Sequence, residues 1–174
     1  MRPILLACAA CSLCAADAVR SLPIVNGSMS QGSDTCTGWD QRWNGGGKLT
    51  ASRDTTVFKV APASLRLQTE GEAKGNVFQF IDVPGGSTID LAGSVRSEGT
   101  VKVLVFVQSF DSTGKPIDYQ MLRNQYEVAP DWVDFNNRIT VPAAAVKVGV
   151  GLAIDGNGKA WLDELRNTAE HKAK

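Results

Sequence analysis

Apolar and polar side chains alternate along much of this chain with a period of two, the pattern of β-strands that have one buried face. Residues 64–70 (SLRLQTE), 87–97 (STIDLAGSVRS) and 132–141 show it most clearly. In the second of these segments, Ile89, Leu91 and Val95 share one face of the expected strand. The alternation therefore predicts strands that turn their apolar side chains toward a common core.

Residues 101–110 are almost wholly apolar, as expected for a central strand that is covered on both faces. A period of two separates the side chains of this strand into two sets. One set is Val101, Val103, Val105 and Val107; the other is Lys102, Leu104, Phe106 and Gln108. The all-valine set is the better core face, which leaves Gln108 in the exposed set.

Turn signals separate about ten such segments, and no segment has a convincing helical period. The turn DSTGKP at 111–116 joins the central strand to residues 117–123, and DGNG at 155–158 predicts a hairpin between 146–154 and 160–166. Strands at this spacing are typical of an all-β fold, either a sandwich or a barrel.

Length and charge narrow the class of protein. The chain has 174 residues, which suits one domain with a substantial core. Its 18 basic and 18 acidic side chains give a formal net charge of +0. Because no basic field exists to attract phosphates, we expect no nucleic-acid partner.

The N-terminal residues 1–18 have the form of a secretory signal peptide. Arg2 precedes an apolar run from Ile4 to Ala16, and small residues allow cleavage after Ala16 or Ala18. The run is shorter than the roughly 20 residues that a membrane-spanning helix needs. We therefore expect a secreted or periplasmic protein without a transmembrane span, with a folded domain at 19–167 and a disordered tail at 168–174.

The cysteines add one alternative to this localisation. Cys8, Cys11 and Cys14 lie in the signal segment, so Cys36 remains alone and cannot form an internal disulfide. The sequence LLAC, which ends at Cys8, looks like a bacterial lipobox, although only seven residues precede that cysteine. A lipid anchor is therefore kept as an alternative to plain secretion.

A series of short motifs follows one order along the chain: NG at 26–27, GW at 38–39, QFIDVPG at 79–85, FDSTGK at 110–115, WVDF at 132–135, ITVPA at 139–143 and GNGKAWLD at 156–163. This order resembles the jelly-roll carbohydrate-binding modules that are appended to secreted xylanases and cellulases, a branch of the galactose-binding-like fold. The resemblance covers residues 26–166. It implies an antiparallel β-sandwich jelly roll that binds a polysaccharide or oligosaccharide without catalysis of its own.

The resemblance also implies a structural calcium ion. Asp163 matches an acid that often binds calcium in this family, and carbonyls near Asn26 and Lys48 would supply further oxygen ligands. The family's usual Phe-Glu pair after Asn-Gly is replaced here by Met29 and Ser30, which removes one expected ligand. The alternative is that Asp163 caps a turn or pairs with a nearby base.

The four tryptophans divide into structural and ligand-binding candidates. Trp39, Trp132 and Trp161 match positions that are structural in the family, whereas Trp43 has no such counterpart. Trp43 lies in a polar segment between Arg42 and Asn44. An aromatic face can stack on a sugar ring while neighbouring amides and guanidinium groups bind its hydroxyls. We therefore predict that Trp43, Arg42 and Asn44 contact sugar.

Three further residues are candidates because the family's sugar binders use the outer, concave face of one sheet. Gln108 belongs to the exposed set of the central strand, Tyr119 lies on the next strand, and Arg96 lies on another. The alternative for each residue is an ordinary solvated sheet surface. These side chains form a binding face only if the fold brings them together.

An enzymatic function has little support in the sequence. His171, the only histidine, lies in the expected tail, so a nucleophile has no histidine base, and no cysteine–histidine spacing suggests zinc. Glycoside hydrolysis needs two facing carboxylates. The adjacent acids Asp163 and Glu164 would point to opposite faces of a strand. We therefore predict no catalysis, with a structural or protein-interaction sandwich of the bacterial cell envelope as the alternative and a small polysaccharide-degrading enzyme as a third.

Overall fold

The computed structural model describes residues 19–20, 24–125 and 129–170, so the predicted signal segment lies outside the described residues. The described residues form strands, turns and loops and contain no helix, which confirms the all-β prediction. The strands are β1 (Val19–Arg20), β2 (Gln41–Asp54), β3 (Ser64–Asp82), β4 (Thr88–Phe110), β5 (Pro116–Gln125), β6 (Val133–Thr140) and β7 (Lys147–Glu170). Within these ranges, nothing helical is long and apolar enough to cross a membrane.

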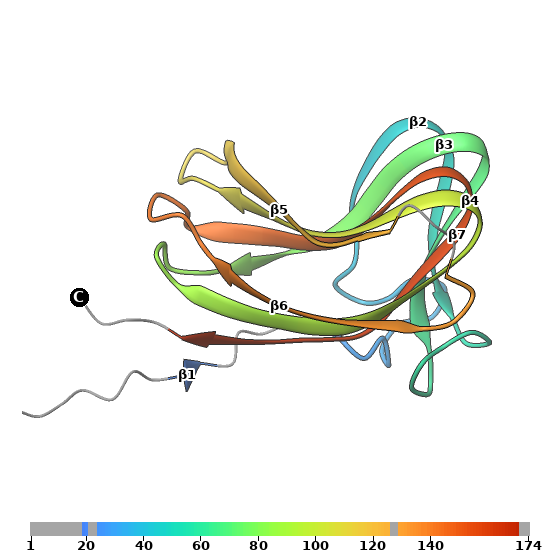
Figure 1. Cartoon of the computed structure of the whole chain (residues 1–174), viewed down its shortest axis with the longest axis horizontal. Coiled ribbons are helices and arrows are strands. Elements are labelled where there is room, and N and C mark those ends of the chain that lie inside the picture. The colour runs from blue at the N-terminus through green and yellow to red at the C-terminus, as the bar shows by residue number, and fades with distance from the viewer. Residues whose placement is uncertain (1–18, 21–23, 126–128, 171–174) are drawn as a thin grey trace, which may run out of the picture.

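All strand pairs are antiparallel, in the order β2-β3-β7-β4-β5, with β6 paired to β4 and β1 to β7. The four long strands β2, β3, β4 and β7 bend over at one end of the molecule, so that each contributes to two layers (Figure 1). The first layer contains 41–46, 74–82, 147–156, 101–110 and β5. The second layer contains 48–54, 64–70, 159–170, 88–98 and β6. This arrangement confirms the predicted antiparallel jelly-roll sandwich.

The core lies between the two layers and follows the predicted faces. Val101, Val103, Val105 and Val107 are all buried. They pack in one cluster with residues of the second layer, among them Leu65, Leu91 and Leu162. Each such side chain contributes about 1.5–3 kcal/mol when it leaves water, so the valine face of β4 contributes a large share of the stability.

Glycines form the bend between the layers. Gly99 in β4 and Gly156 in β7 have φ values of 92° and 116°, which L side chains rarely adopt. The pairing of β4 with β7 continues across this bend, from Asp155 opposite Lys102 to Lys159 opposite Glu98. The predicted hairpin at 155–158 is therefore wrong: the chain keeps its direction and crosses from one layer to the other.

The same bend explains why about ten expected strands are seven. Residues 64–70 form the first part of the single strand β3, which continues to Asp82, and β4 and β7 each join two expected strands in the same way. Gly71, with a φ of 68°, marks the bend in β3. Turn residues in the sequence here signal a change of layer. β7 also continues to Glu170, three residues past the expected domain boundary, while residues 171–174 lie outside the described ranges.

The segment before β2 closes one edge of the sandwich. Met29, Cys36 and Trp39 are buried there, and the indole N–H of Trp39 donates to the carbonyl of Asn26 at 3.4 Å. Burial raises the pKa of the Cys36 thiol to about 12. A thiol that stays protonated and buried is a packing residue, not a nucleophile.

A covering loop, residues 55–63, lies against the outer face of the second layer. Two carboxylates hold this loop in place. Asp54 lies at its start, and Asp163 on β7 binds its middle, where Oδ2 accepts the backbone N–H groups of Lys59 at 2.8 Å and Val60 at 3.0 Å. Trp161 is buried beneath this loop with 1% of its surface exposed. The covering loop thus supplies the shielding that a tryptophan on the outer side of a sheet needs.

Candidate functional site

Six aromatic side chains lie on the outer face of the first layer, which we call the aromatic face. They are Trp43, Phe78, Phe80, Phe106, Phe110 and Tyr119. Strand register places them there: Phe78 and Phe106 flank Gly151 of β7, and Tyr119 is opposite Gln108. In Figure 1 the first layer rises toward β5 on one side and toward the bend on the other, so that this face is concave.

Five of these rings, all except Trp43, form one connected series. Tyr119 stacks on Phe106 with centroids 5.4 Å apart, and Phe106 lies 6.4 Å from Phe78. Phe80 makes edge contacts with Phe78 at 5.2 Å and with Phe110 at 5.4 Å. Phe106 is itself buried, and these contacts hold the exposed rings of Phe80 and Tyr119 in fixed orientations, which lowers the entropy cost of binding a flat ligand.

Two glycines of β7 make room for the rings. A Cβ at Gly151 would lie 2.6 Å from the Cβ of Phe78 and 2.9 Å from Cζ of Phe106. A Cβ at Gly149 would lie 3.2 Å from the Phe78 ring. The rings therefore lie down over the strand instead of standing away from it.

The register of β3 decides that phenylalanines face outward. Val77 and Gln79, which alternate with Phe78 and Phe80, face the interior and are almost fully buried. The Gln79 side-chain amide is fully hydrogen-bonded there: it accepts from the N–H of Val25 at 2.8 Å and donates to the carbonyl of Val25 at 3.1 Å. A buried glutamine with both amide groups paired costs little, so the strand can turn its phenylalanines to solvent.

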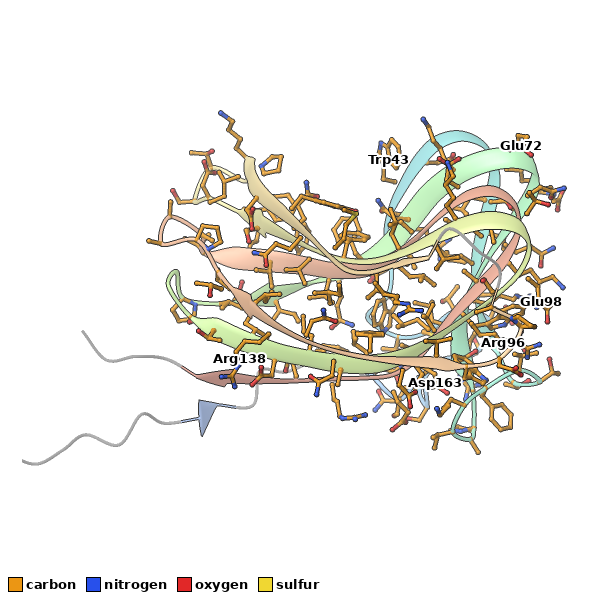
Figure 2. The ribbon with its side chains drawn as sticks, viewed as in Figure 1. Trp43, Glu72, Arg96, Glu98, Arg138 and Asp163 are labelled. Carbon is orange, nitrogen blue, oxygen red and sulfur yellow. The ribbon has the colours of Figure 1, made fainter. Side chains whose placement is uncertain are left out.

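Three predicted sugar contacts share the aromatic face. Trp43 is 53% exposed and Tyr119 is 47% exposed, while Gln108 is partly exposed between β7 and β5. The Trp43 ring lies over Gly45, where a Cβ would approach it to 2.3 Å. Partial burial raises the pKa of the Tyr119 phenol, so it stays a neutral hydrogen-bonding group. Figure 2 shows Trp43 on the upper side of the first layer, beside the bend.

The other three predicted sugar contacts lie elsewhere. Arg42 is exposed but aligns with the inward-facing Val77, so it points to the opposite side of β2 from Trp43. The Asn44 amide is engaged within its own turn, donating to the carbonyl of Gly47 at 3.1 Å and accepting from the N–H of Gly46 at 3.0 Å.

Arg96 belongs to the second layer (Figure 2). Its guanidinium lies over the Trp161 ring at 5.3 Å and donates to Glu98 at 2.6 Å. Arg96 therefore covers a buried tryptophan and cannot act together with Trp43.

Two of the three predicted calcium ligands, Asp163 and the Asn26 carbonyl, already accept hydrogen bonds within the protein. The Asp163 carboxylate accepts three backbone N–H groups, the third from Glu164 at 2.8 Å, and burial raises the pKa of this carboxyl group. The Asn26 carbonyl accepts the N–H of Met29 at 3.1 Å.

Lys48 lies on β2 opposite Glu70, with which its ammonium pairs at 2.8 Å. Among the described residues, no three His, Cys, Asp or Glu side chains gather as a metal site. Asp163 as a cap of the covering loop is the arrangement that the structure shows, and a calcium site built on it stays a prediction.

Several residues of the aromatic face were not singled out by sequence reasoning. Met121, 55% exposed, lies opposite Phe106, and the Lys147 ammonium lies 4.4 Å from the Phe80 ring centroid. The signal that could have found the phenylalanines is the pair of glycines in VGVGL, because small residues on a central strand make room for rings on its neighbours.

Comparison with solved structures identifies the fold. The CBM22-1 xylan-binding domain of Paenibacillus barcinonensis Xyn10C aligns over 91% of this chain and 98% of its own, with 16% identity and a TM-score of 0.62. The carbohydrate-binding module TmCBM61, solved in complex with β-1,4-galactotriose, aligns over 85% and 97%, with 10% identity and a TM-score of 0.57.

The enzymatically active domain of bacteriophage CBA120 tailspike protein 4 is also similar. It aligns over 84% of this chain with 18% identity and a TM-score of 0.70. This chain spans only 21% of the tailspike chain, in contrast to its near-complete match to the two modules.

No protein-family model matches the sequence, and comparison with curated proteins gave no match. Identities below a fifth support a common fold without fixing a ligand. The chain therefore has the jelly-roll β-sandwich fold of carbohydrate-binding modules, and its aromatic face is the candidate site.

Proposed function

We propose that this chain is a secreted, non-catalytic protein that binds a polysaccharide or oligosaccharide on its aromatic face. The observation that carries the proposal is the shared exposure of Trp43, Phe80 and Tyr119 on one concave face, with Gln108 among them. The likeness to xylan-binding and galactotriose-bound modules supports this class of ligand.

Binding would combine stacking with hydrogen bonds. Trp43 and Tyr119 offer open ring faces for the C–H surface of a sugar. The side chain of Gln108 makes no hydrogen bond to another described residue, so its amide is available to sugar hydroxyls. Each contact is modest in water, so affinity depends on several sugar units binding at once.

Affinity gel electrophoresis on a panel of soluble polysaccharides tests the proposal. We expect xylan, galactan or β-glucan to retard the wild-type protein, and Trp43→Ala and Tyr119→Ala to reduce the retardation. Phe58, on the covering loop and 37% exposed, offers the matched control, because Phe58→Ala removes an exposed ring far from the aromatic face. Retardation that all three variants retain would contradict the proposal.

A protein-interaction role is the second candidate, and one observation favours it. Phe80 is 40% exposed and Met121 55% exposed on the same face, an apolar character that also suits a protein partner. If no polysaccharide retards the wild type, and Met121→Lys changes its molar mass in solution by light scattering, the interaction role replaces sugar binding. Release of reducing sugars that one acid substitution abolishes would instead show an enzyme.

A further inference from the structure

A polar pocket of about 410 Å³ opens on the outer face of the second layer, on the opposite side of the molecule from the aromatic face. Its floor is Ala92 and Gly93 of β4, and the covering loop forms one wall through Lys59 and Val60. A smaller pocket of about 210 Å³ lies beside it and shares Ala92, Asn136 and Arg166 in its lining.

The floor of the polar pocket has to be small. Gly93 occupies an irregularity in the pairing of β4 with β7, and a Cβ there would lie 2.8 Å from the Phe135 ring. Phe135 itself is 7% exposed, so it offers no open ring for stacking. A ligand in this pocket must therefore be recognised by hydrogen bonds.

The walls carry hydrogen-bonding groups with unused capacity. The Arg166 guanidinium makes one long bond, 3.5 Å from Nη1 to the carbonyl of Glu164. Within the described part of the chain, the side chains of Asn136 and Glu164 make no hydrogen bond. Glu164 holds its position through a left-handed backbone, with a φ of 53°, and such strained residues concentrate at functional sites.

Charge in the polar pocket is balanced. Lys59 pairs with Asp134 at 2.7 Å, and Arg166 faces the same carboxylate, whose pKa is lowered first by the Lys59 hydrogen bond. Glu164 supplies the second negative group. A charged ligand would meet a like charge at one wall, whereas vicinal hydroxyls can accept from guanidinium and amide donors and donate to carboxylates.

We propose that the polar pocket is a second binding site, which takes one neutral sugar residue through its hydroxyls. Arg166, Asn136 and Glu164 bind that sugar residue. The volume of the pocket limits the ligand to the end of a saccharide chain or a single sugar ring. The site is independent of the aromatic face. If the aromatic face also binds saccharide, which rests on the proposed function, one molecule can cross-link two saccharide chains.

Nuclear magnetic resonance of isotope-labelled full-length protein tests the site. The probes are methyl xyloside, methyl galactoside, methyl glucoside and, as an anionic comparison, glucuronate. We expect at least one neutral probe to shift the backbone amides of Gly93, Asn136 and Arg166 in a saturable manner. Arg166→Ala should weaken that binding at least tenfold, since it removes charge-assisted bonds.

Two variants separate this site from the proposed function and from misfolding. Trp43→Ala should leave the amide shifts in the polar pocket unchanged. Arg138 is an exposed arginine on the same outer face, forms an ion pair with Asp90 at 2.6 Å and lines neither pocket. Arg138→Ala should therefore also show the amide shifts in the polar pocket. The absence of any shift with all neutral probes, equal binding by Arg166→Ala, or tighter binding of glucuronate would each overturn the proposal.

Discussion

The indole N–H of Trp161 donates to the carboxylate of Asp54 at 2.9 Å, joining residues that are 107 positions apart in the chain. The same carboxylate accepts from the backbone and hydroxyl of Thr56 and from Val57, and pairs with Arg66 at 3.2 Å. This contact fixes the start of the covering loop over the second layer. It also explains the unusual sequence WLDEL: Trp161 binds Asp54, Asp163 caps the covering loop, and Glu164 lines the polar pocket.

Removing the charge of Asp54 should destabilise the protein in a pH-dependent way. Burial alone would raise the pKa of this carboxyl group, but hydrogen bonds from Trp161, Thr56 and Val57 outweigh it and hold the pKa far below its usual value. A depressed pKa stabilises the fold above the unfolded pKa of about 3.9, and that stability is lost as the pH falls toward the folded pKa.

We expect Asp54→Asn to lower the free energy of unfolding by about 2–3 kcal/mol near neutral pH, because it leaves buried donors poorly matched. Urea unfolding of both proteins at about pH 7 and about pH 3 measures the effect. The difference in unfolding free energy between the wild type and Asp54→Asn should be smaller at the lower pH. A gap that stays constant would show that the charge of Asp54 is not responsible.

The calcium prediction rests on Asp163. A bound ion would raise the melting temperature in calcium relative to chelator, through preferential binding to the folded state. This increase should disappear in Asp163→Asn, which keeps an acceptor for the covering loop but loses the charge that attracts calcium. Differential scanning calorimetry of both proteins provides the measurement. Equal melting temperatures of the wild type in calcium and chelator would leave Asp163 as a loop cap alone.

Substitutions in the bend should separate backbone strain from collision. Gly71 and Gly156 both have positive φ, but a Cβ at Gly71 meets nothing within 4 Å, whereas one at Gly156 would lie 2.2 Å from the carbonyl oxygen of Thr100. We expect Gly71→Ala to cost about 1 kcal/mol and Gly156→Ala more than about 3 kcal/mol. Urea unfolding of the two variants checks this order. Similar costs would mean that the strands change layer without a close approach of β4 and β7.

Gly151 should be required for the aromatic face, and Gly149 much less so. A Cβ at Gly151 would lie 2.4 Å from the carbonyl oxygen of Val77 as well as close to two rings, while the nearest atom to one at Gly149 is 3.2 Å away. We expect Gly151→Ala to destabilise by about 2–3 kcal/mol and Gly149→Ala by less than about 1 kcal/mol. Thermal unfolding, with near-ultraviolet circular dichroism for the rings, measures both. Equal tolerance at the two positions would contradict the proposed ring packing.

The alternation in β4 was enough to predict the core, because one of its two faces is all valine and those residues are buried. The alternation in the second part of β3, residues 76–82, was not enough. Both faces of that strand carry apolar residues, and only the pairing of Gln79 with the backbone of Val25, 54 positions away, decides which face is inside. Long-range pairing of this kind leaves no local signal in the sequence.

The glycine bends were missed for a related reason. A glycine cluster such as DGNG has the composition of a hairpin turn, and only the partner strand shows whether the chain reverses or crosses between layers. Gln108 and Tyr119 could be predicted as neighbours because a short turn joins their strands, whereas Trp43 lies on the same face with two strands, β3 and β7, between β2 and β4. Arg96 could not be excluded, because nothing in the sequence says that β4 changes layer between Arg96 and Gln108.

Isothermal titration calorimetry with the polysaccharide that most retards the wild type tests the central claim most directly, using Trp43→Ala and Phe58→Ala as the matched pair. We predict that Trp43→Ala weakens binding at least tenfold, or about 1.4 kcal/mol, while its melting temperature is unchanged and Phe58→Ala binds like the wild type. Equal affinity of Trp43→Ala and the wild type, with both proteins folded, would contradict sugar binding on the aromatic face.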